Sequence, residues 1–398
     1  MELESISTET MAEAVAYATD IRRKLHSQPE LTWKEYATGK FLAEQLATFP
    51  KLTVDYPVAE TGVIARLKGG KTGPTIALRA DMDALPLTEQ TGVSYRSQTD
   101  GVMHACGHDG HMANLLGAIR ILHDHSHEIC GELIFVFQPA EEGGAGAKKI
   151  CESGALADAD GVFGLHGWPE LELGKFYVKD GAAFAANAIL DIQVKGQGCH
   201  GAMPHLGTDQ ILIGARIVEQ IQSIASRMTA PTEPVVVTIG EFHAGTTDNI
   251  IPETAHLRGT IRAMSSERLQ VVSDRIAAIA TAVASSHGAE AEVNIKPCYP
   301  AVINHKGATD YLRSCFKKHF REDPTCEMPA PTMGSEDFSF YLQERPGSYF
   351  LLGLSAPDWQ THSLHSPFFD FNDKALTFGI RAFLAIVADM VSFPRFQR

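Results

Sequence analysis

The chain has 398 residues, enough for about two domains, and its 44% hydrophobic and 21% charged content is typical of a soluble globular protein. A formal net charge of −14 argues against nucleic acid or an anionic membrane surface as the main partner. We expect neither a secretory signal nor a membrane span, because no basic stretch precedes an apolar core and no apolar run approaches ~18 residues. Seven scattered cysteines favour a reducing cytoplasm over a disulfide framework.

The first part of the chain alternates helices with apolar strands. The spacing of apolar residues predicts helices over 8–27, 33–48 and 109–125. Strands are predicted over 62–69, 74–83, 131–138 and 161–168. The last three of these strands run into polar residues, and in open α/β sheets ligands bind at this carboxyl edge.

The pattern changes near residue 183. Strands over 185–196, 233–245, 254–264 and 291–297 enclose helices over 209–228 and 267–286, which gives the order βαββαβ of a ferredoxin-like α+β domain. Helix–strand alternation then resumes and ends in a long helix over 373–391. The predicted fold is α/β, a catalytic domain with a central, mostly parallel sheet (residues 1–183 and 299–398) interrupted by an inserted domain (residues 184–298).

Metal-competent side chains concentrate in GVMHACGHDGH, residues 101–111. Cys106 and His108, two residues apart on an extended segment, would point to the same side, and a thiolate with an imidazole can hold borderline-soft cations. Asp109 could cap the helix that follows. Alone, this pair carries little weight, because a buried cysteine beside a surface histidine has the same pattern.

Further polar residues follow the predicted strands. In the pair Glu141-Glu142, one carboxylate could ligate a metal while the other moves protons, although a solvated acidic loop has the same sequence. His166 ends the strand that begins at 161, and His365 precedes the last helix. The remaining strand end carries a pair of aspartates, Asp81 and Asp83. Because these positions gather at one sheet edge, we expect a joint site.

Nine short motifs occur along the chain: RADMDALP (79–86), MHACGHDGH (103–111), FQPAEEGGAGA (137–147), GLHGW (164–168), CHGAMPHLGTD (199–209), DNIIPE (248–253), GTIRAM (259–264), GSEDFSF (334–340) and LHSPFFDFND (364–373). In this order they resemble the amidohydrolase branch of the dinuclear metallo-aminoacylase and carboxypeptidase family. That branch includes hippurate hydrolases, N-acyl-amino-acid amidohydrolases and plant indole-3-acetyl-amino acid hydrolases. The resemblance is specific for family and fold but not for substrate.

The resemblance implies two divalent metal ions per subunit, Mn²⁺ or Zn²⁺, with Co²⁺ or Ni²⁺ as other suitable ions. It implies one general base, Glu141, and the metal ligands Cys106, His108, Glu142, His166 and His365. Asp83 fits a partner that orients a ligand. The wider family has a ligating histidine where this chain has Asp81, so a ligand role for Asp81 stays open, as do the roles of His104 and His111.

The inserted domain carries three further candidates, His200, Asn249 and Arg262, which could also be ordinary polar residues. A guanidinium can hold a carboxylate through two hydrogen bonds, so Arg262 suits a substrate's α-carboxylate. The resemblance implies that this domain is a dimerisation and lid module, in a homodimer or homotetramer. In relatives the histidine equivalent to His200 polarises the scissile carbonyl in the partner's site; whether it acts in cis or in trans here stays open.

The predicted function is a cytoplasmic, metal-dependent hydrolase of small N-acyl-amino acids, of N-acetyl or N-benzoyl type, in which Glu141 is the base for a metal-activated water. Hippurate hydrolase is one such activity. A dipeptidase or carboxypeptidase on the same site, a silent metal-binding relative and a cysteine hydrolase using Cys106 are the alternatives. The acyl group, the amino acid and the native metal stay open.

Overall fold

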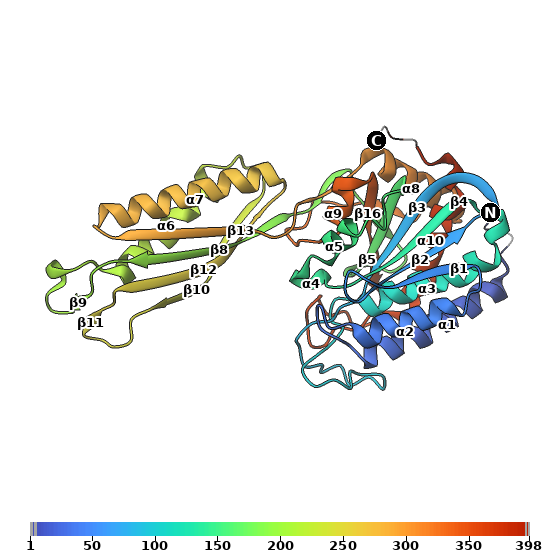
Figure 1. Cartoon of the computed structure of the whole chain (residues 1–398), viewed down its shortest axis with the longest axis horizontal. Coiled ribbons are helices and arrows are strands. Elements are labelled where there is room, and N and C mark those ends of the chain that lie inside the picture. The colour runs from blue at the N-terminus through green and yellow to red at the C-terminus, as the bar shows by residue number, and fades with distance from the viewer. Residues whose placement is uncertain (1–2, 4–5, 395, 397–398) are drawn as a thin grey trace. The chain divides into compact units, whose positions relative to one another are not determined.

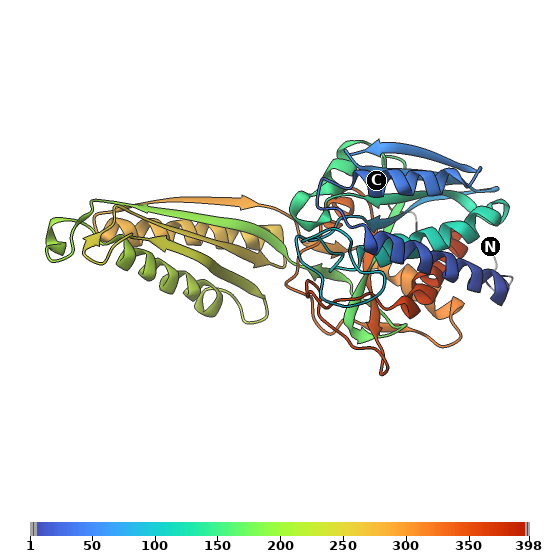
Figure 2. The same cartoon turned by 90° about the horizontal axis from the view of Figure 1, so that it is seen from below.

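The computed structural model describes residues 3, 6–394 and 396. The chain forms two compact units: unit 1 contains Met1–Gly181, Ile303–Pro329 and Asp337–Arg398, and unit 2 contains Ala182–Val302 and Ala330–Glu336. The segment 330–336 belongs to unit 2 because its backbone bonds to residues 183–185. Figure 2 shows that helices from both the beginning and the end of the chain belong to unit 1.

Unit 1 is built on an eight-stranded mixed sheet, which confirms the predicted α/β class. Its strands lie in the order β1 (Leu52–Val58), β2 (Gly62–Lys68), β4 (Cys130–Gln138), β3 (Lys71–Asp81), β5 (Gly161–Glu172), β16 (Gly347–Ser355), β6 (Phe176–Val178) and β15 (Thr325–Glu327). The four central strands, β4, β3, β5 and β16, are parallel (Figure 1). The pairs β1–β2, β2–β4 and β16–β6 are antiparallel.

Helices cover both faces of this sheet. On one face, the core that contains Phe135 and Phe137 of β4 includes α1 (Thr8–Ser27), α3 (His108–Asp124), α8 (Lys306–His319) and α10 (Leu376–Ala388). Ile134 and Val136 face the other side, because side chains alternate along a strand. The helices α5 (Gly146–Glu152) and α9 (Ser339–Glu344) pack together and contact β4 and β16, respectively, and α2 (Tyr36–Ala47) packs on β1.

The prediction of one long helix over 373–391 was wrong. The segment consists of a 3-10 turn η4 (Asp373–Ala375), the helix α10 and a second 3-10 turn η5 (Met390–Ser392). The Asn372 side chain accepts the Lys374 N–H, which starts the first turn, and α10 ends at Ala388, with Asp389 as its C-cap. Two short strands, β7 (Gly181–Phe184) and β14 (Val302–Asn304), pair with each other.

Unit 2 has the βαββαβ order that the sequence predicts. Its elements are β8 (Ala186–Lys195), α6 (Gln210–Arg227), β10 (Val235–Ala244), β12 (Thr254–Ala263), α7 (Ser266–Ser286) and β13 (Glu290–Pro297). The antiparallel sheet has the order β10-β12-β8-β13, the ferredoxin-like arrangement, and both helices cover one face of it (Figure 1). A second small sheet pairs β9 (Cys199–His200) with β11 (Ile250–Ile251).

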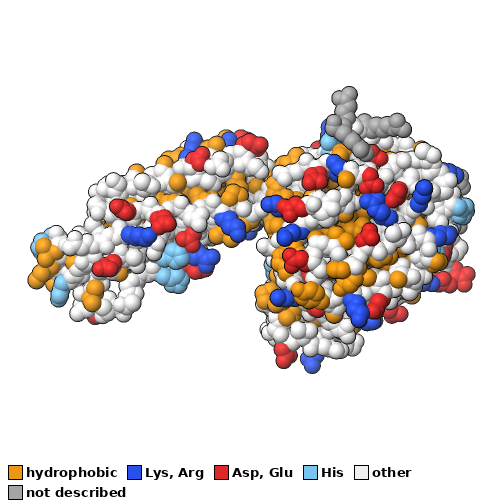
Figure 3. Space-filling model, viewed as in Figure 1, with side chains coloured by type: hydrophobic (Ala, Val, Ile, Leu, Met, Phe, Trp, Pro, Cys, Tyr) orange, Lys and Arg blue, Asp and Glu red, His pale blue; other side chains and the backbone are white. Residues whose placement is uncertain are grey.

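In the part of the chain that the structure describes, no helix has the length and apolarity needed to cross a membrane. On the face shown in Figure 3, acidic and basic side chains are interspersed, and apolar side chains are also visible on unit 2.

Candidate metal centre

The segment before α3 differs from the prediction in two respects. Cys106 and His108 do not lie on an extended segment: α3 begins at His108, and Gly107 adopts a left-handed φ of 87°, which glycine permits at low cost. Asp109 does not cap α3 either. Its carboxylate is buried and accepts from Arg22 and His26, both at 2.8 Å. A turn, and not strand alternation, therefore brings the thiol and the imidazole together.

Two groups of potential ligand atoms share Cys106. One group joins Cys106 to His108 and His166, and the other joins it to Glu142 and His365; within each group all ligand atoms lie within 4.8 Å of one another. All five residues belong to unit 1. Two three-donor groups with one thiol in common can hold two neighbouring cations.

Asp81, the last residue of β3, and Asp83, two residues beyond it, organise this cluster. The Nδ1–H of His108 donates to the Asp83 carbonyl at 2.8 Å, which fixes the tautomer and directs Nε2 toward the cluster. Asp81 is held by Arg79 at 2.6 Å and accepts from His111 Nδ1 at 2.6 Å. The other ring nitrogen of His111 accepts the Gly167 N–H at 2.8 Å. His111 forms a further potential ligand group with Asp81 and His108, but both of its nitrogens are engaged by the protein, which disfavours a ligand role for this residue.

The turn after β4 carries Glu141 and Glu142. Their backbone N–H groups donate to the two carboxylate oxygens of Asp83, each at 3.0 Å, and the Thr32 hydroxyl donates to Asp83 at 2.8 Å. Glu141 and Glu142 also form a potential ligand group with His108. The Asp83 carboxylate therefore fixes the backbone of both glutamates while its carbonyl orients His108.

His166 and His365 complete the set from distant parts of the chain. His166 lies on β5, donates Nδ1–H to the Gly167 carbonyl at 2.8 Å and directs Nε2 at the Cys106 sulfur, 3.4 Å away. His365 has a left-handed φ of 63° and places Nε2 3.2 Å from Glu142 Oε1. Its backbone N–H donates to the Ala105 carbonyl at 2.8 Å, so His365 is held beside the segment that carries Cys106.

The donor set fits divalent cations. Nε2 of His108 is buried and has no hydrogen-bond partner among the described residues. Burial alone would lower the pKa of His108, but Asp81 and Asp83 raise it to about 10. Burial and the charge of Glu142 raise the pKa of the Cys106 thiol well above its usual range. A cation in this cluster would balance the surplus carboxylate charge and favour the thiolate.

His104 is buried beside the cluster, and neither ring nitrogen has a hydrogen-bond partner among the described residues. Burial lowers its pKa to about 4, so the ring is neutral at physiological pH. His104 belongs to none of the groups of potential ligand atoms found among these residues. Its ring centroid lies 6.5 Å from that of His26, which is consistent with a packing role.

Sequence reasoning missed a buried polar network on α1. Arg22 contacts Asp109, next to His108, and Asp370, five residues after His365, so it joins two ligand-bearing segments. His26 lies between Asp109 and Glu89. A signal was present, because Arg22 and His26 fall at four-residue spacing after the buried Ala18, on the apolar face of the helix.

Glu35 was missed as well. It is fully buried just before α2, yet its side chain makes no cap for that helix. Instead it accepts the Ala140 N–H at 2.9 Å, at the start of the turn that carries Glu141. No pattern in the sequence indicated this contact, because a backbone N–H is available at almost every position.

The three candidates in unit 2 do not gather at one place. His200 on β9 pairs with Ile250 of β11, and the adjacent Asn249 carbonyl accepts the Gly201 N–H at 2.8 Å. Figure 1 shows β9 and β11 at one end of unit 2. Arg262 lies eight residues after Thr254, the first residue of β12, roughly 26 Å along an extended strand. Its Nη1 donates to the Met333 carbonyl and Ser335 hydroxyl, both at 3.0 Å.

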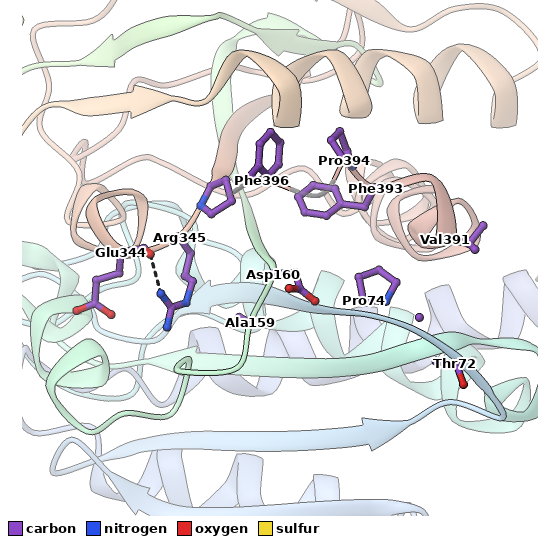
Figure 4. A pocket seen from close by; sticks show the side chains of 12 residues that line it. Thr72, Pro74, Ala159, Asp160, Glu344, Arg345, Val391, Phe393, Pro394 and Phe396 are labelled. Carbon is purple, nitrogen blue, oxygen red and sulfur yellow. Dashed lines mark hydrogen bonds between the residues drawn. The ribbon is translucent and has the colours of Figure 1, made fainter. Parts of the chain in front are cut away.

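A separate cavity of about 570 Å³ lies at the amino ends of β3, β5 and β16, the sheet edge opposite to Asp81 and His166 (Figure 4). Two of its charged side chains, Arg345 and Asp160, already bind backbone groups. Arg345 donates to the carbonyls of Leu156 and Ala157, and Asp160 accepts the Thr75 N–H. The cavity therefore lacks the converging donors that the carboxyl edge has.

An α/β unit with thiol, imidazole and carboxylate donors at the carboxyl edge of its sheet has the features of a metal-dependent hydrolase. The sequence model of peptidase family M20/M25/M40 matches residues 77–389, and the chain belongs to this family. Its assignment as an enzyme that hydrolyses amide C–N bonds is thereby confirmed.

Three similar proteins illustrate the range of the family. The chain is 36% identical over 370 residues to N-acetylcysteine deacetylase of Bacillus subtilis, covering 92% of this chain and 96% of that one. It is 40% identical over 336 residues to thermostable carboxypeptidase 2 of Saccharolobus solfataricus, covering 84% of each. The crystal structure of the Bacillus subtilis YXEP protein, described as a dinuclear metal-binding peptidase of the M20 family, matches with a TM-score of 0.84 and 32% identity, covering 96% of this chain and 100% of that one.

Proposed function

We propose that this protein is a metal-dependent amidohydrolase that cleaves N-acyl-amino acids to a carboxylate and a free amino acid. The observation that carries this proposal is the Glu141-Glu142 turn: Glu142 belongs to a potential ligand group with Cys106 and His365 and Glu141 does not, although both glutamates belong to a group with His108. A binding or storage site needs ligands but no additional base. Similarity to N-acetylcysteine deacetylase supports an N-acyl substrate.

Cys106, His108, Glu142, His166 and His365 would hold two divalent cations, of Mn²⁺, Zn²⁺, Co²⁺ or Ni²⁺ type. When bound, such ions lower the pKa of a water molecule and polarise a substrate carbonyl. Glu141 would take the proton from the attacking water and deliver it to the leaving nitrogen. Asp83 would keep the Glu141 carboxylate in place through the backbone contact described above.

Unit 2 would bind the substrate and complete the oxyanion site. Arg262 would hold the α-carboxylate with the guanidinium N–H groups that do not bind Met333 and Ser335. His200 would donate a hydrogen bond to the developing oxyanion, and Asn249 would assist in binding. The distance along β12 argues against Arg262 and Asn249 of one subunit reaching the same small substrate.

A homodimer would remove this difficulty, because His200 and Asn249 could then reach a site whose Arg262 belongs to the other subunit. The outer side of β10 supports such an interface. This strand lies at the edge of its sheet; Phe242 on the strand is exposed to 39%, and Ile211 on α6 is exposed to 47%. An unpaired sheet edge with exposed apolar side chains is suited to pairing with a second copy.

All seven cysteines are free, which fits a reducing, cytoplasmic location.

The second candidate function is a dipeptidase or carboxypeptidase on the same site, which the similarity to thermostable carboxypeptidase 2 favours. A substrate panel separates the two. The metal-reconstituted protein should be assayed on N-acetyl-amino acids, N-benzoyl-amino acids and dipeptides, with chelated protein as the control. We expect kcat/KM for an N-acyl-amino acid to exceed that for every dipeptide by at least about tenfold. The reverse order would establish the peptidase alternative.

A further inference from the structure

The turn that carries the two glutamates has an irregular backbone. Three of its residues have left-handed φ angles: Ala140 at 56°, Gly143 at 86° and Ala145 at 58°. For a residue with a Cβ this conformation is strained and persists only when surrounding contacts hold it. The direction in which Glu141 projects therefore depends on whatever fixes this turn.

Three consecutive peptide N–H groups in the turn donate to two buried carboxylates. Ala140 donates to Glu35 at 2.9 Å, and Glu141 and Glu142 donate to Asp83 at 3.0 Å each. Hydrogen bonds to an ionised acceptor such as Asp83 are among the stronger ones in proteins. Asp83 holds the two glutamates directly, while Glu35 holds the strained residue that immediately precedes them.

The contacts of Glu35 do not fit an ordinary structural glutamate. Its Oε1 also accepts the Trp33 N–H at 3.1 Å, and its Oε2 accepts the Thr61 hydroxyl at 2.8 Å. No lysine, arginine or histidine pairs with it among the described residues. A buried carboxylate without a cation is costly, so it is kept only where its acceptor atoms are needed. One of these contacts holds the turn at Ala140, and none of them caps the helix that follows Glu35.

We propose that Glu35 is a positioning residue for the general base: by accepting the Ala140 N–H it fixes the left-handed residue that directs Glu141 toward the substrate. The proposal rests on the proposed function, since it takes Glu141 as the base. Because Asp83 still holds both glutamates when Glu35 is lost, the ligand Glu142 stays in place and the damage falls on turnover.

Three variants separate this role from general stability. Glu35→Met keeps the side-chain volume but removes the acceptors, Glu35→Asp keeps the charge but withdraws it by one methylene, and Glu35→Gln keeps an acceptor at Oε1. The matched control is Glu30→Ala. Glu30 accepts from Ala37 and Thr38 in the first turn of α2 but makes no contact with residues 140–142 among the described residues.

Each metal-reconstituted variant is assayed for kcat, KM, metal content, melting temperature and hydrogen exchange at residues 140–142. We expect Glu35→Met and Glu35→Asp to lose about 10- to 100-fold in kcat, as small misplacements of catalytic groups do. KM and metal content should change little, and exchange at 140–142 should accelerate. Glu35→Gln should stay within about threefold of wild type. Glu30→Ala should lower the melting temperature without lowering kcat.

Three results would overturn the proposal: wild-type kcat in folded Glu35→Asp, equal losses in Glu35→Gln and Glu35→Met, or metal loss in proportion to activity. If Glu35→Met does not fold, the Glu35→Asp and Glu35→Gln pair still decides. Failure of the proposed function is recognised separately, because the wild-type enzyme would then prefer a different amide in the panel. The ratio of the variant's kcat to that of the wild type, measured on that amide, would still test Glu35. So would hydrogen exchange at residues 140–142.

Discussion

The backbone N–H of His365 donates to the carbonyl of Ala105 at 2.8 Å, so two segments separated by 260 positions are joined next to the candidate metal centre. His365 lies beside Glu142 and Cys106 belongs to the same potential ligand group. Arg22 joins the same two segments a second time, through Asp109 and Asp370. The cluster is therefore held by backbone and side-chain contacts that do not require a metal, which makes single-residue tests interpretable.

Glu141→Gln tests the base. The amide cannot take up a proton, while the ligands and the Asp83 contacts to the turn remain, so we expect full metal content with a ~10²- to 10⁴-fold loss of kcat. Metal analysis and steady-state kinetics on the same preparation check this. Glu44→Gln, at an exposed position of α2, serves as the control. Activity within tenfold of wild type would remove Glu141 from the role of base.

Cys106→Ser tests the shared ligand. A neutral hydroxyl replaces a soft anionic thiolate, so metal affinity should fall by at least about 100-fold, given that mutation of residues that merely orient ligands can cost 10- to 100-fold. Competition with a chelator measures the change, and Cys151→Ser on α5 is the control. Unchanged affinity would show that the thiol is not a ligand. If activity of the wild type survived removal of the metal by dialysis, the cysteine-hydrolase alternative would regain support.

The sequence predicted most of the fold because its elements have strong local patterns. Helix 8–27 and the βαββαβ order depend on apolar spacing, which tertiary structure rarely overrides in long segments. The candidate site was predicted less completely. Cys106, His166 and Glu142 stand in recognisable motifs, but the left-handed turn at Gly107 that brings Cys106 and His108 together left no periodic signal.

The residues that the sequence did not indicate were missed for different physical reasons. Arg22 and His26 could have been found, because charged residues on an apolar helix face need buried partners. Glu35 could not, since two of its three partners are backbone N–H groups that every non-proline residue supplies, and the third is the hydroxyl of Thr61. The separation between Arg262 and Asn249 could have been expected, because Arg262 falls near the end of the predicted strand 254–264 and Asn249 precedes its start.

Protonation of Glu35 should stabilise the metal-free protein at low pH, and this contribution should be lost as pH rises from about 4.5 to about 7. Burial and the neighbouring charge of Asp83 raise the pKa of Glu35 from 4.5 to about 7. In this window the folded state binds more protons than the unfolded state, so stability falls with pH by up to ~1.4 kcal/mol per unit from this group. Urea unfolding of the chelated protein at several pH values measures the slope. Glu35→Gln should remove this contribution from the pH dependence of the unfolding free energy, and Glu44→Gln should leave it unchanged. The same slope of unfolding free energy against pH in the wild type and both variants would contradict the assignment.

Phe242→Glu tests the proposed interface. Phe242 lies on the edge strand β10, with its ring beside Gly214 of α6, and a carboxylate there would have to be desolvated on pairing with a second copy. We expect the variant to sediment as a monomer at concentrations where the wild type is a dimer, while Val271→Glu, also at an exposed apolar position, should not change the oligomeric state. A monomeric wild type would refute the interface. Full activity in a monomeric variant would show that His200 does not act in trans.

Arg262→Ala tests the substrate class. If Arg262 binds the α-carboxylate, its loss removes a charge-assisted contact of roughly 1.5–3 kcal/mol, or about 10- to 200-fold in kcat/KM. The loss should be large for N-acyl-amino acids and small for the corresponding amides, which carry no charge at that position. Arg262 also binds Met333 and Ser335, so part of the loss will be common to both substrates. Dividing the loss of kcat/KM on the acid by the loss on the amide removes this common part.

Two controls make that ratio decisive. Ser335→Ala breaks one of the structural contacts of Arg262 but leaves the guanidinium, so it should affect acid and amide alike. Arg258→Ala removes an exposed arginine from the same strand, where it pairs with Asp191 and Glu241, and should leave both rates near wild type. Equal losses on acid and amide in Arg262→Ala would exclude the arginine from carboxylate recognition. The preference for amino-acid conjugates would then have to come from other residues, and the carboxypeptidase alternative would lose its most plausible carboxylate-binding group as well.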